Sequence, residues 1–236
     1  MDANALASLV QSHHLTREAL SSYSSDFAST PARFSVIDDF LVPETAERLS
    51  EFLRNEAEFK SEHGLYSTEG HKVEEAEWLA APEDERFFRY GKLVGTPPQF
   101  QFSPNSLAYL KFRTAFQNDD NLRTFFVEWT GLELARSDDF GSHSLGVGDF
   151  LKEHDDSDKN RRLALVLYLS PEWKPEFGGA LHITDESGGE WAVEPTYNSI
   201  VVFDTLAGTK HYVAPVRDAA GEQRRVTIGG WYHAPD

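Results

Sequence analysis

The stretch GDFLKEHDDSDKNRRLALVLYL (148–169) says most about the fold class of this chain. It ends in a run of aliphatic and aromatic residues, which is typical of a buried β-strand. Short strands at regular spacing favour a sandwich or barrel, so we expect a double-stranded β-helix, or jelly roll. Similar runs follow it, separated by turn residues such as Gly and Pro: ALHI (180–183), NSIVVF (198–203), HYVAPV (211–216) and RRVTIGGWY (224–232).

Helical patterns characterise much of the chain before residue 140. We expect a helical lead-in over 1–32, a short strand over 33–41, and helices that begin at Pro43, cover 106–117 and end at Gly131. Residues 61–105 are rich in Gly, Pro, Glu and aromatics, with a short helix expected around Pro82 to Tyr90. We therefore predict one α+β domain over 1–236. In it, the mainly helical residues 1–140 support the fold and cover the substrate, and residues 141–236 form the jelly-roll core with the functional site.

The composition excludes several classes of function. The chain has no cysteine, so disulfides, thiolate nucleophiles and cysteine-bound metals are absent, which fits a reducing cytoplasm. Its formal net charge is −17, so the chain lacks the excess of basic residues that nucleic-acid binding needs. No run approaches the roughly 20 apolar residues of a membrane helix, and the first residues do not resemble a secretory signal. We expect a cytoplasmic protein without nucleic-acid or membrane partners.

Two potential metal ligands, His154 and Asp156, stand two residues apart in the opening stretch. In an extended strand their side chains project from the same face. A third ligand has to come from elsewhere, and His211 opens the later strand HYVAPV. Two imidazoles and one carboxylate form the facial triad that leaves positions open on Fe(II) for oxygen chemistry. His143 and His182, which also lie near the predicted strands, are the alternatives for the third ligand.

A second pair of polar side chains, Arg225 and Thr227, shares one face of the strand RRVTIGGWY by alternation. A guanidinium beside a hydroxyl is suited to gripping both oxygens of a carboxylate. An arginine at a strand edge whose partner is solvent would give the same pattern. Arg225 and Thr227 are therefore a candidate anion site, and further evidence from the sequence is needed to choose between the two interpretations.

The pieces GDFLKEHDD, RRLALVLYLSPEW, EFGGALHI, NSIVVFD, KHYVAPV and RRVTIGGWY occur in this order between about residues 143 and 232. This ordered set resembles the Fe(II)/2-oxoglutarate oxygenase superfamily, in the branch that contains the prolyl hydroxylases. The resemblance implies Fe(II), 2-oxoglutarate and O₂ as cofactors. It also implies that His154, Asp156 and His211 bind the metal.

The same resemblance assigns the cosubstrate site. Arg225 falls where the family places the cation that binds the 5-carboxylate of 2-oxoglutarate, and the Thr227 hydroxyl would support that contact. Tyr168 matches a tyrosine that reaches the same carboxylate in prolyl hydroxylases, although a core tyrosine would look the same. One departure is that many relatives carry a tyrosine nine residues before the first ligand, where this chain has Leu145.

The resemblance also favours a reaction. Related halogenases have Gly or Ala in place of the carboxylate ligand, so Asp156 indicates hydroxylation. We expect hydroxylation of an aliphatic C–H bond in an amino acid or amino-acid-like unit, coupled to decarboxylation of 2-oxoglutarate to succinate and CO₂. The alternative is a protein prolyl hydroxylase acting on a protein partner. A more distant alternative is a non-oxidative cupin-like metal-binding or hydrolytic protein, against which Arg225 and Thr227 argue.

The substrate cover is the least defined part of the prediction. We expect Trp231 to pack behind the strand that holds the cosubstrate. Bulky side chains of the N-terminal half are candidates to contact substrate at the mouth of the barrel: Tyr66, Trp78, Arg89, Tyr90, Phe102 and Tyr109.

Overall fold

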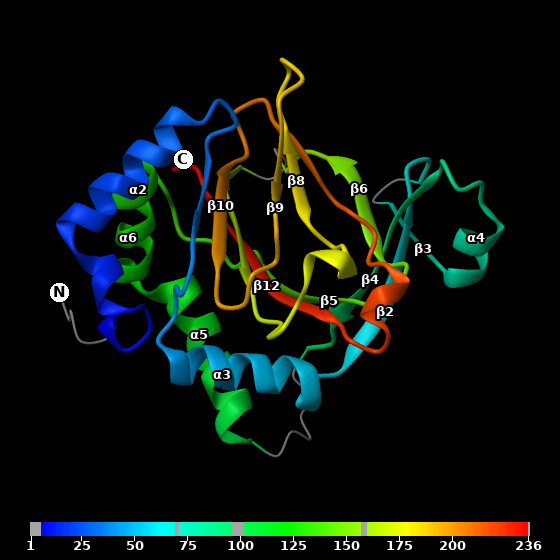
Figure 1. Ribbon diagram of the computed structural model, residues 1–236, viewed down its shortest axis with the longest axis horizontal. Helices are drawn as coiled ribbons and strands as arrows, with labels where there is room; N and C mark the ends of the chain where they lie inside the picture. The colour runs from blue at the N-terminus through cyan, green and yellow to red at the C-terminus, as the bar shows by residue number, and fades with distance from the viewer. Residues whose placement is uncertain (1–5, 69–70, 96–101, 157–159, 236) are drawn as a thin grey trace.

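The structure, a computed structural model, describes residues 6–68, 71–95, 102–156 and 160–235 (Figure 1). The N-terminal half contains η1 (Ser12–Leu15), α2 (Arg17–Ser29), β1 (Phe34–Ile37), α3 (Pro43–Glu51), the π-helical turn η2 (Phe52–Glu56), β2 (Phe59–Leu65), β3 (Lys72–Val73), α4 (Glu75–Ala80), β4 (Arg86–Leu93), α5 (Pro104–Asn118) and α6 (Asp120–Thr130). The C-terminal half contains β5 (Phe140–Leu145), β6 (Phe150–His154), β7 (Arg161–Tyr168), η3 (Pro175–Phe177), β8 (Leu181–Thr184), β9 (Glu190–Val193), β10 (Ile200–Asp204), β11 (Lys210–Val213), η4 (Asp218–Ala220) and β12 (Arg225–His233).

The strands form one curled antiparallel sheet in the order β1-β10-β7-β12-β5-β4-β6-β11-β8-β9, with β2 and β3 attached beside β4. β4 pairs with β5 through Gly91 and Lys92, and with β6 through Phe88 and Arg89. β4 therefore joins the layer β10-β7-β12-β5 to the layer β6-β11-β8-β9. The inner faces of the two layers share one apolar cluster, so they face each other as the two halves of a jelly roll. The predicted α+β jelly roll is confirmed.

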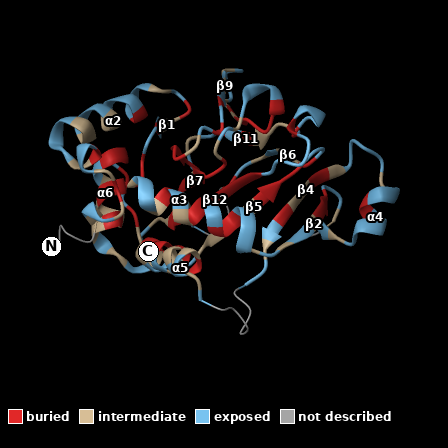
Figure 2. Ribbon diagram, turned by 60° about the horizontal axis from the view of Figure 1, so that its bottom comes forward, coloured by how far each residue is buried: buried red, intermediate tan, exposed pale blue. Residues whose placement is uncertain are grey.

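Alternation along the strands separates two environments. In β12, Val226, Ile228 and Tyr232 point toward the helices and join the main core, whereas Arg225 and Thr227 point into the space between the layers. The helices α2, α3, α5 and α6 cover the outer face of the first layer (Figures 1 and 2). They leave the opposite face of that layer free to build a site.

Local sequence explains where the helices begin and end. Pro43 occupies the first turn of α3, where its missing N–H costs nothing. At the start of α5, Ser103 and Ser106 cap each other reciprocally, with N···O distances of 2.9 and 3.0 Å. Gly131 ends α6 with φ of 69°, the left-handed conformation that glycine adopts without strain. These three boundaries agree with the sequence prediction.

The prediction of a short helix around Pro82 to Tyr90 is wrong, because strand β4 (Arg86–Leu93) lies there. This strand is stabilised by backbone pairing with β2, β5 and β6. The local pattern of apolar residues in the sequence indicates none of these pairings. The N-terminal half consequently contains strands as well as helices. It supplies the strand that joins the two layers, so the jelly roll draws on both sides of residue 140.

Within the described ranges, none of the helices combines the length and the apolar character needed to cross a lipid bilayer.

Candidate metal and cosubstrate site

A cavity of about 330 Å³ lies between the two layers of the jelly roll. It is lined by His154, Asp156 and His211 as well as by Arg225 and Thr227, so the structure brings both groups of predicted site residues to one space. A larger cavity, of about 780 Å³, lies on the opposite face of β12, with Val226 in its lining, and none of these five residues lines it. The chemistry therefore points to the smaller cavity.

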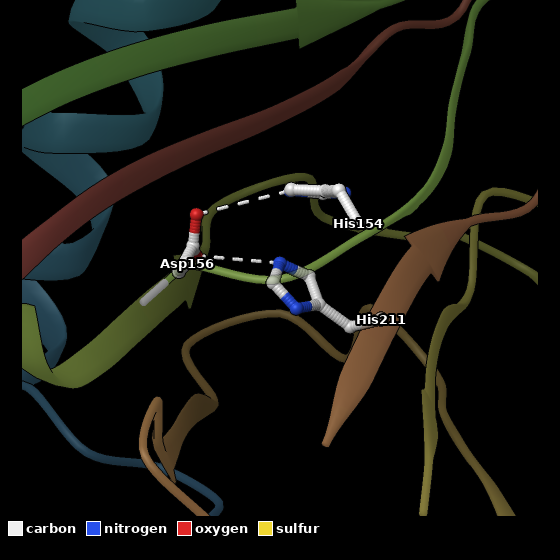
Figure 3. Close-up of side chains that lie close together, drawn as sticks. All are labelled: His154, Asp156 and His211. Atoms are coloured by element: carbon white, nitrogen blue, oxygen red, sulfur yellow. Dashed lines mark ion pairs between the residues drawn. The ribbon is translucent and has the colours of Figure 1, made fainter. Parts of the chain in front are cut away.

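The three candidate ligands converge from two neighbouring strands (Figure 3). His154 ends β6 and pairs directly with His211 of β11 in the strand register. Asp156 lies just beyond the end of β6, rather than within an extended strand as predicted, but its side chain still turns to the same place. One ligand atom from each residue lies within 4.8 Å of the others. Two imidazoles and a carboxylate at this spacing suit a divalent metal with open positions, as in non-haem iron enzymes.

The protonation of these groups also fits a metal site. The Nδ1 atom of His154 lies 2.9 Å from the Lys152 carbonyl oxygen, which can only accept, so Nδ1 carries the proton and Nε2 is free to bind. Burial, with help from His211, lowers the pKa of His154 to about 4, which keeps the ring neutral near pH 7. Burial would raise the pKa of Asp156, but the facing His211 outweighs it and lowers that pKa, so the carboxylate is charged.

Asp156 is held by two further donors that the sequence analysis did not assign to the site. The Trp231 indole N–H donates to Asp156 Oδ2 at 2.9 Å, and Arg161 Nη1 donates to Oδ1 at 3.1 Å. Arg161 lies over the Trp231 ring at 3.8 Å and also bonds to Asp139 at 2.7 Å. The expectation that Trp231 packs behind the strand is wrong. Alternation from Arg225 puts it on the cavity face, so the signal was present in the sequence.

Replacing Trp231 with phenylalanine is expected to lower affinity for Fe(II) by about 10- to 100-fold, because partners that orient a ligand carry effects of this size. Anaerobic metal titration measures it. The control is Trp173→Phe, which removes an indole N–H bonded to the Gly178 carbonyl instead of to Asp156. Equal metal affinity in the wild type and Trp231→Phe would show that the indole does not orient the carboxylate.

The cosubstrate residues sit on the adjacent part of the inner face. Arg225 is 3% exposed, and no carboxylate of the described residues forms an ion pair with it. Its guanidinium lies 4.9 Å from the ring centre of the fully buried Tyr168. Arg225 Nε has no hydrogen-bond partner within the described part of the chain, and the Tyr168 hydroxyl has none other than the facing Arg225. A buried cation without an ion-pair partner is costly, so this arrangement suits an anionic ligand group.

Thr227 and His143 continue this row of polar side chains across the sheet. Thr227 pairs with Tyr168 of β7 on one side and with His143 of β5 on the other. His143 lines the cavity, but it is not one of the three residues whose ligand atoms converge. Burial, followed by the nearby charge of Lys92, lowers the pKa of His143 to about 4, so it presents a neutral ring.

The space beside Leu145 contains a tyrosine from a different strand. Tyr90 of β4 packs against Leu145 and lines the cavity. Its ring is stacked on Phe88 at 4.7 Å and contacts His143 edge-on at 5.0 Å. Burial, then the charges of Glu62 and Asp156, raises the pKa of Tyr90, so its hydroxyl is a neutral donor. The sequence analysis names Tyr90 as a candidate for substrate contact. It could not predict that Tyr90 lies beside Leu145, because this position depends on the pairing of β4 with β5.

Most of the other candidates lie elsewhere. His182 points outward, stacked on Tyr212 at 4.5 Å and bonded to Glu190 at 2.7 Å. Tyr66 is 43% exposed, donates to the Glu153 carbonyl and packs at a tilt against Phe87, a residue of the cavity lining. The remaining five candidates of the N-terminal half differ: Tyr90 lines the cavity, whereas Trp78, Arg89, Phe102 and Tyr109 do not.

Comparison with known proteins gives a family. Residues 142–233 match the model of the 2OG-Fe(II) oxygenase superfamily. The prolyl 3-hydroxylase OGFOD1 of Xenopus laevis is 31% identical over 120 residues, and the prolyl 3-hydroxylase sudestada1 of Drosophila melanogaster is 35% identical over 176 residues. These alignments cover 48% and 68% of this chain but only 23% and 30% of the relatives, so the chain spans less than a third of either protein.

Solved structures support the fold. A prolyl-4-hydroxylase from Pseudomonas putida has a TM-score of 0.60 at 23% identity, and covers 92% of this chain and 100% of its own. A prolyl hydroxylase from Trichoplax adhaerens, solved with a peptide of the hypoxia inducible factor oxygen degradation domain, has a TM-score of 0.60 at 15% identity, covering 94% and 93%. The predicted resemblance to the prolyl-hydroxylase-like branch is confirmed.

Proposed function

We propose that this protein hydroxylates a prolyl residue of a protein partner, using Fe(II), 2-oxoglutarate and O₂, because residues 142–233 match the 2OG-Fe(II) oxygenase superfamily and the curated relatives are prolyl 3-hydroxylases. The observation that carries the proposal is the buried Arg225, which forms no ion pair with the described residues and lies in the same cavity as His154, Asp156 and His211. A cupin-like binding protein or a zinc hydrolase would have no use for a buried cation without an anionic partner.

Each side chain has a defined task in this proposal. His154 and His211 would bind the metal through Nε2, and Asp156 through one oxygen while Trp231 and Arg161 fix its orientation. Arg225, with the Tyr168 hydroxyl, would hold the distal carboxylate of 2-oxoglutarate. When bound, the iron and 2-oxoglutarate supply the oxidising chemistry, in which CO₂ and succinate are released and one oxygen atom enters a substrate C–H bond.

The surroundings of the site exclude water from this chemistry. Phe203 packs against the His211 ring at 4.8 Å, and Phe87 contacts the His154 ring edge-on at 5.7 Å. Leu181 and Val213 complete an apolar wall on the side of the second layer. A dry, preformed pocket protects a reactive site from side reactions and strengthens the electrostatic contacts within it.

The cavity suits a neutral substrate unit better than a free amino acid. A free amino acid brings an ammonium group, which needs a carboxylate partner when buried. The carboxylates of the cavity lining are Asp139 and Asp156, and both are already bonded to Arg161. A prolyl residue within a polypeptide has neither an ammonium group nor an N–H. The two curated relatives, both described as prolyl 3-hydroxylases, also support this alternative over a small-molecule substrate.

The test is a comparison of substrate fractions. A cell extract is separated into a protein fraction and a small-molecule fraction, and each is incubated with the purified protein, Fe(II) and 2-oxoglutarate. We expect succinate formation to rise with the protein fraction, together with one added oxygen on a prolyl residue detected by mass spectrometry. Stimulation by the small-molecule fraction alone, with no oxidised proline, would favour a free amino acid substrate instead.

A further inference from the structure

Two glycines face each other on the inner wall of the cavity. Gly229 of β12 and Gly141 of β5 are register partners, and both line the cavity. Glycine inside a strand weakens it by about 0.5–1 kcal/mol relative to alanine, and often marks a place where a ligand or another backbone comes close. The presence of two glycines side by side in neighbouring strands therefore needs an explanation.

The backbone does not require either of these glycines. Neither has a positive φ. A Cβ atom on Gly229 would meet only the Leu165 carbonyl oxygen at 3.7 Å, and one on Gly141 would lie 3.5 Å from the His143 ring, both ordinary contacts. Gly230 is different, because its Cβ would lie 2.7 Å from the Phe116 ring on the helical side. Gly230 permits helix packing, whereas Gly141 and Gly229 leave space in the cavity.

The side chains on the β7 side of this space are apolar. Val166 of β7 pairs with Gly229, and Ala164 of β7 pairs with Trp231. Phe203 pairs with Ala164 from the next strand, and all four of these side chains belong to one apolar cluster. The indole N–H of Trp231 bonds to Asp156, so the cluster adjoins the candidate metal site. The result is a floor without side chains, with an apolar wall on the β7 side and the polar side chains of Thr227 and His143 beside it, next to the candidate metal site.

We propose that Gly141 and Gly229 form the subsite that receives the ring of the substrate prolyl residue. This inference rests on the proposed function and makes it more specific. A prolyl ring is saturated, has no polar hydrogen and is compact, so it needs apolar walls and a flat floor rather than hydrogen-bond partners. The two glycines determine specificity by size, since any side chain at either position would occupy the volume that the ring needs.

The experiment uses the full chain loaded with Mn(II), which does not turn over, together with 2-oxoglutarate. The probe is N-acetyl-L-prolinamide, and the paramagnetic broadening of its ring protons is followed by NMR. We expect concentration-dependent broadening with the wild-type protein. Gly229→Val and Gly141→Val should weaken it by about tenfold or more, because even one extra carbon atom in an apolar pocket has an effect of this size and valine adds three. Binding of Mn(II) and 2-oxoglutarate should stay unchanged.

Two controls separate occlusion from misfolding. Gly229→Ala is expected to keep the wild-type melting temperature or raise it, whereas Gly230→Ala should lower it, because only the second meets an aromatic ring at close range. N-acetyl-L-argininamide, whose long charged side chain does not fit an apolar floor, should show little broadening with the wild-type protein.

The outcomes distinguish the inference from the proposed function. If the wild type binds Mn(II) and 2-oxoglutarate but broadens the prolyl ring no more than either valine variant does, the subsite is wrong and the cofactor site stands. If the wild type binds neither the metal nor 2-oxoglutarate, the proposed function and the subsite both fail.

Discussion

His211→Ala is expected to abolish the visible charge-transfer band that Fe(II) and 2-oxoglutarate give together under anaerobic conditions. Succinate formation should fall by about a thousandfold or more, because the metal contributes several kcal/mol to the reaction and each 1.4 kcal/mol is about tenfold in rate. His211 is 6% exposed and its Nε2 atom lies 3.3 Å from Asp156 Oδ2, so its removal breaks the ligand set at the centre. Anaerobic absorption spectra and a succinate assay measure the two effects.

The control for His211 is another histidine of the same layer. His182 pairs with Tyr212, the residue after His211, and points to the outer face of the sheet. His182→Ala should therefore leave the absorption band and the succinate rate unchanged. An unaltered band in His211→Ala, or an equal loss in both variants, would contradict the assignment of His211 as a ligand.

Arg225→Ala is expected to weaken binding of 2-oxoglutarate by about a hundredfold or more while leaving metal affinity largely intact. Truncating one side of a buried, hydrogen-bonded charge pair costs about 2–5 kcal/mol, and each 1.4 kcal/mol is about tenfold in affinity. The affinity of Arg225→Lys for 2-oxoglutarate should lie between those of the wild type and Arg225→Ala. An ammonium group keeps the charge but loses the bidentate geometry of the guanidinium. Calorimetric titration of 2-oxoglutarate into the Mn(II)-loaded protein gives the affinities.

The neighbouring Arg224 is a matched control for Arg225. It points to the opposite face of β12 and donates to Ser144 Oγ at 2.6 Å, so Arg224→Ala should not change affinity for 2-oxoglutarate. A thermal shift adds a second reading, since a ligand that binds the folded state raises its melting temperature. 2-Oxoglutarate should stabilise the wild type and Arg224→Ala but not Arg225→Ala. Stabilisation of Arg225→Ala by the same amount would show that another group binds the cosubstrate.

The parts of the site that the sequence predicted are those whose geometry is local. His154 and Asp156 are only two residues apart, so they stay close although Asp156 lies beyond the end of β6. Arg225 and Thr227 alternate on one strand, so their common face follows from strand geometry. His211 could be placed beside His154 only through the family pattern, because the register of β6 and β11 is a long-range property. Trp231 was within reach of the alternation rule and was still assigned to the wrong face.

The parts that the sequence did not predict depend on contacts between distant segments. β2 and β4 contain glycine and mixed polar and aromatic residues, and their strand conformation is stabilised by pairing with each other and with β5 and β6. Tyr90 reaches the cavity only because of that pairing. Arg161 bonds to Asp156 from the start of β7, where the register with β12 shifts between Tyr232 and His233, and no local pattern predicts that irregularity.

The place of β12 has a consequence for how the protein is made. It is the last strand along the described chain, yet it lies in the middle of the first layer, paired with β5 on one side and β7 on the other. Until residues 225–233 leave the ribosome, a nascent chain has an open gap between two strands, with unpaired edges and apolar side chains exposed. Insertion of β12 into that gap makes the sheet continuous and delivers Arg225, Thr227, Gly229 and Trp231 in one step. An unfinished chain therefore has neither a continuous sheet nor the proposed anion site, and we expect it not to bind the cosubstrate prematurely.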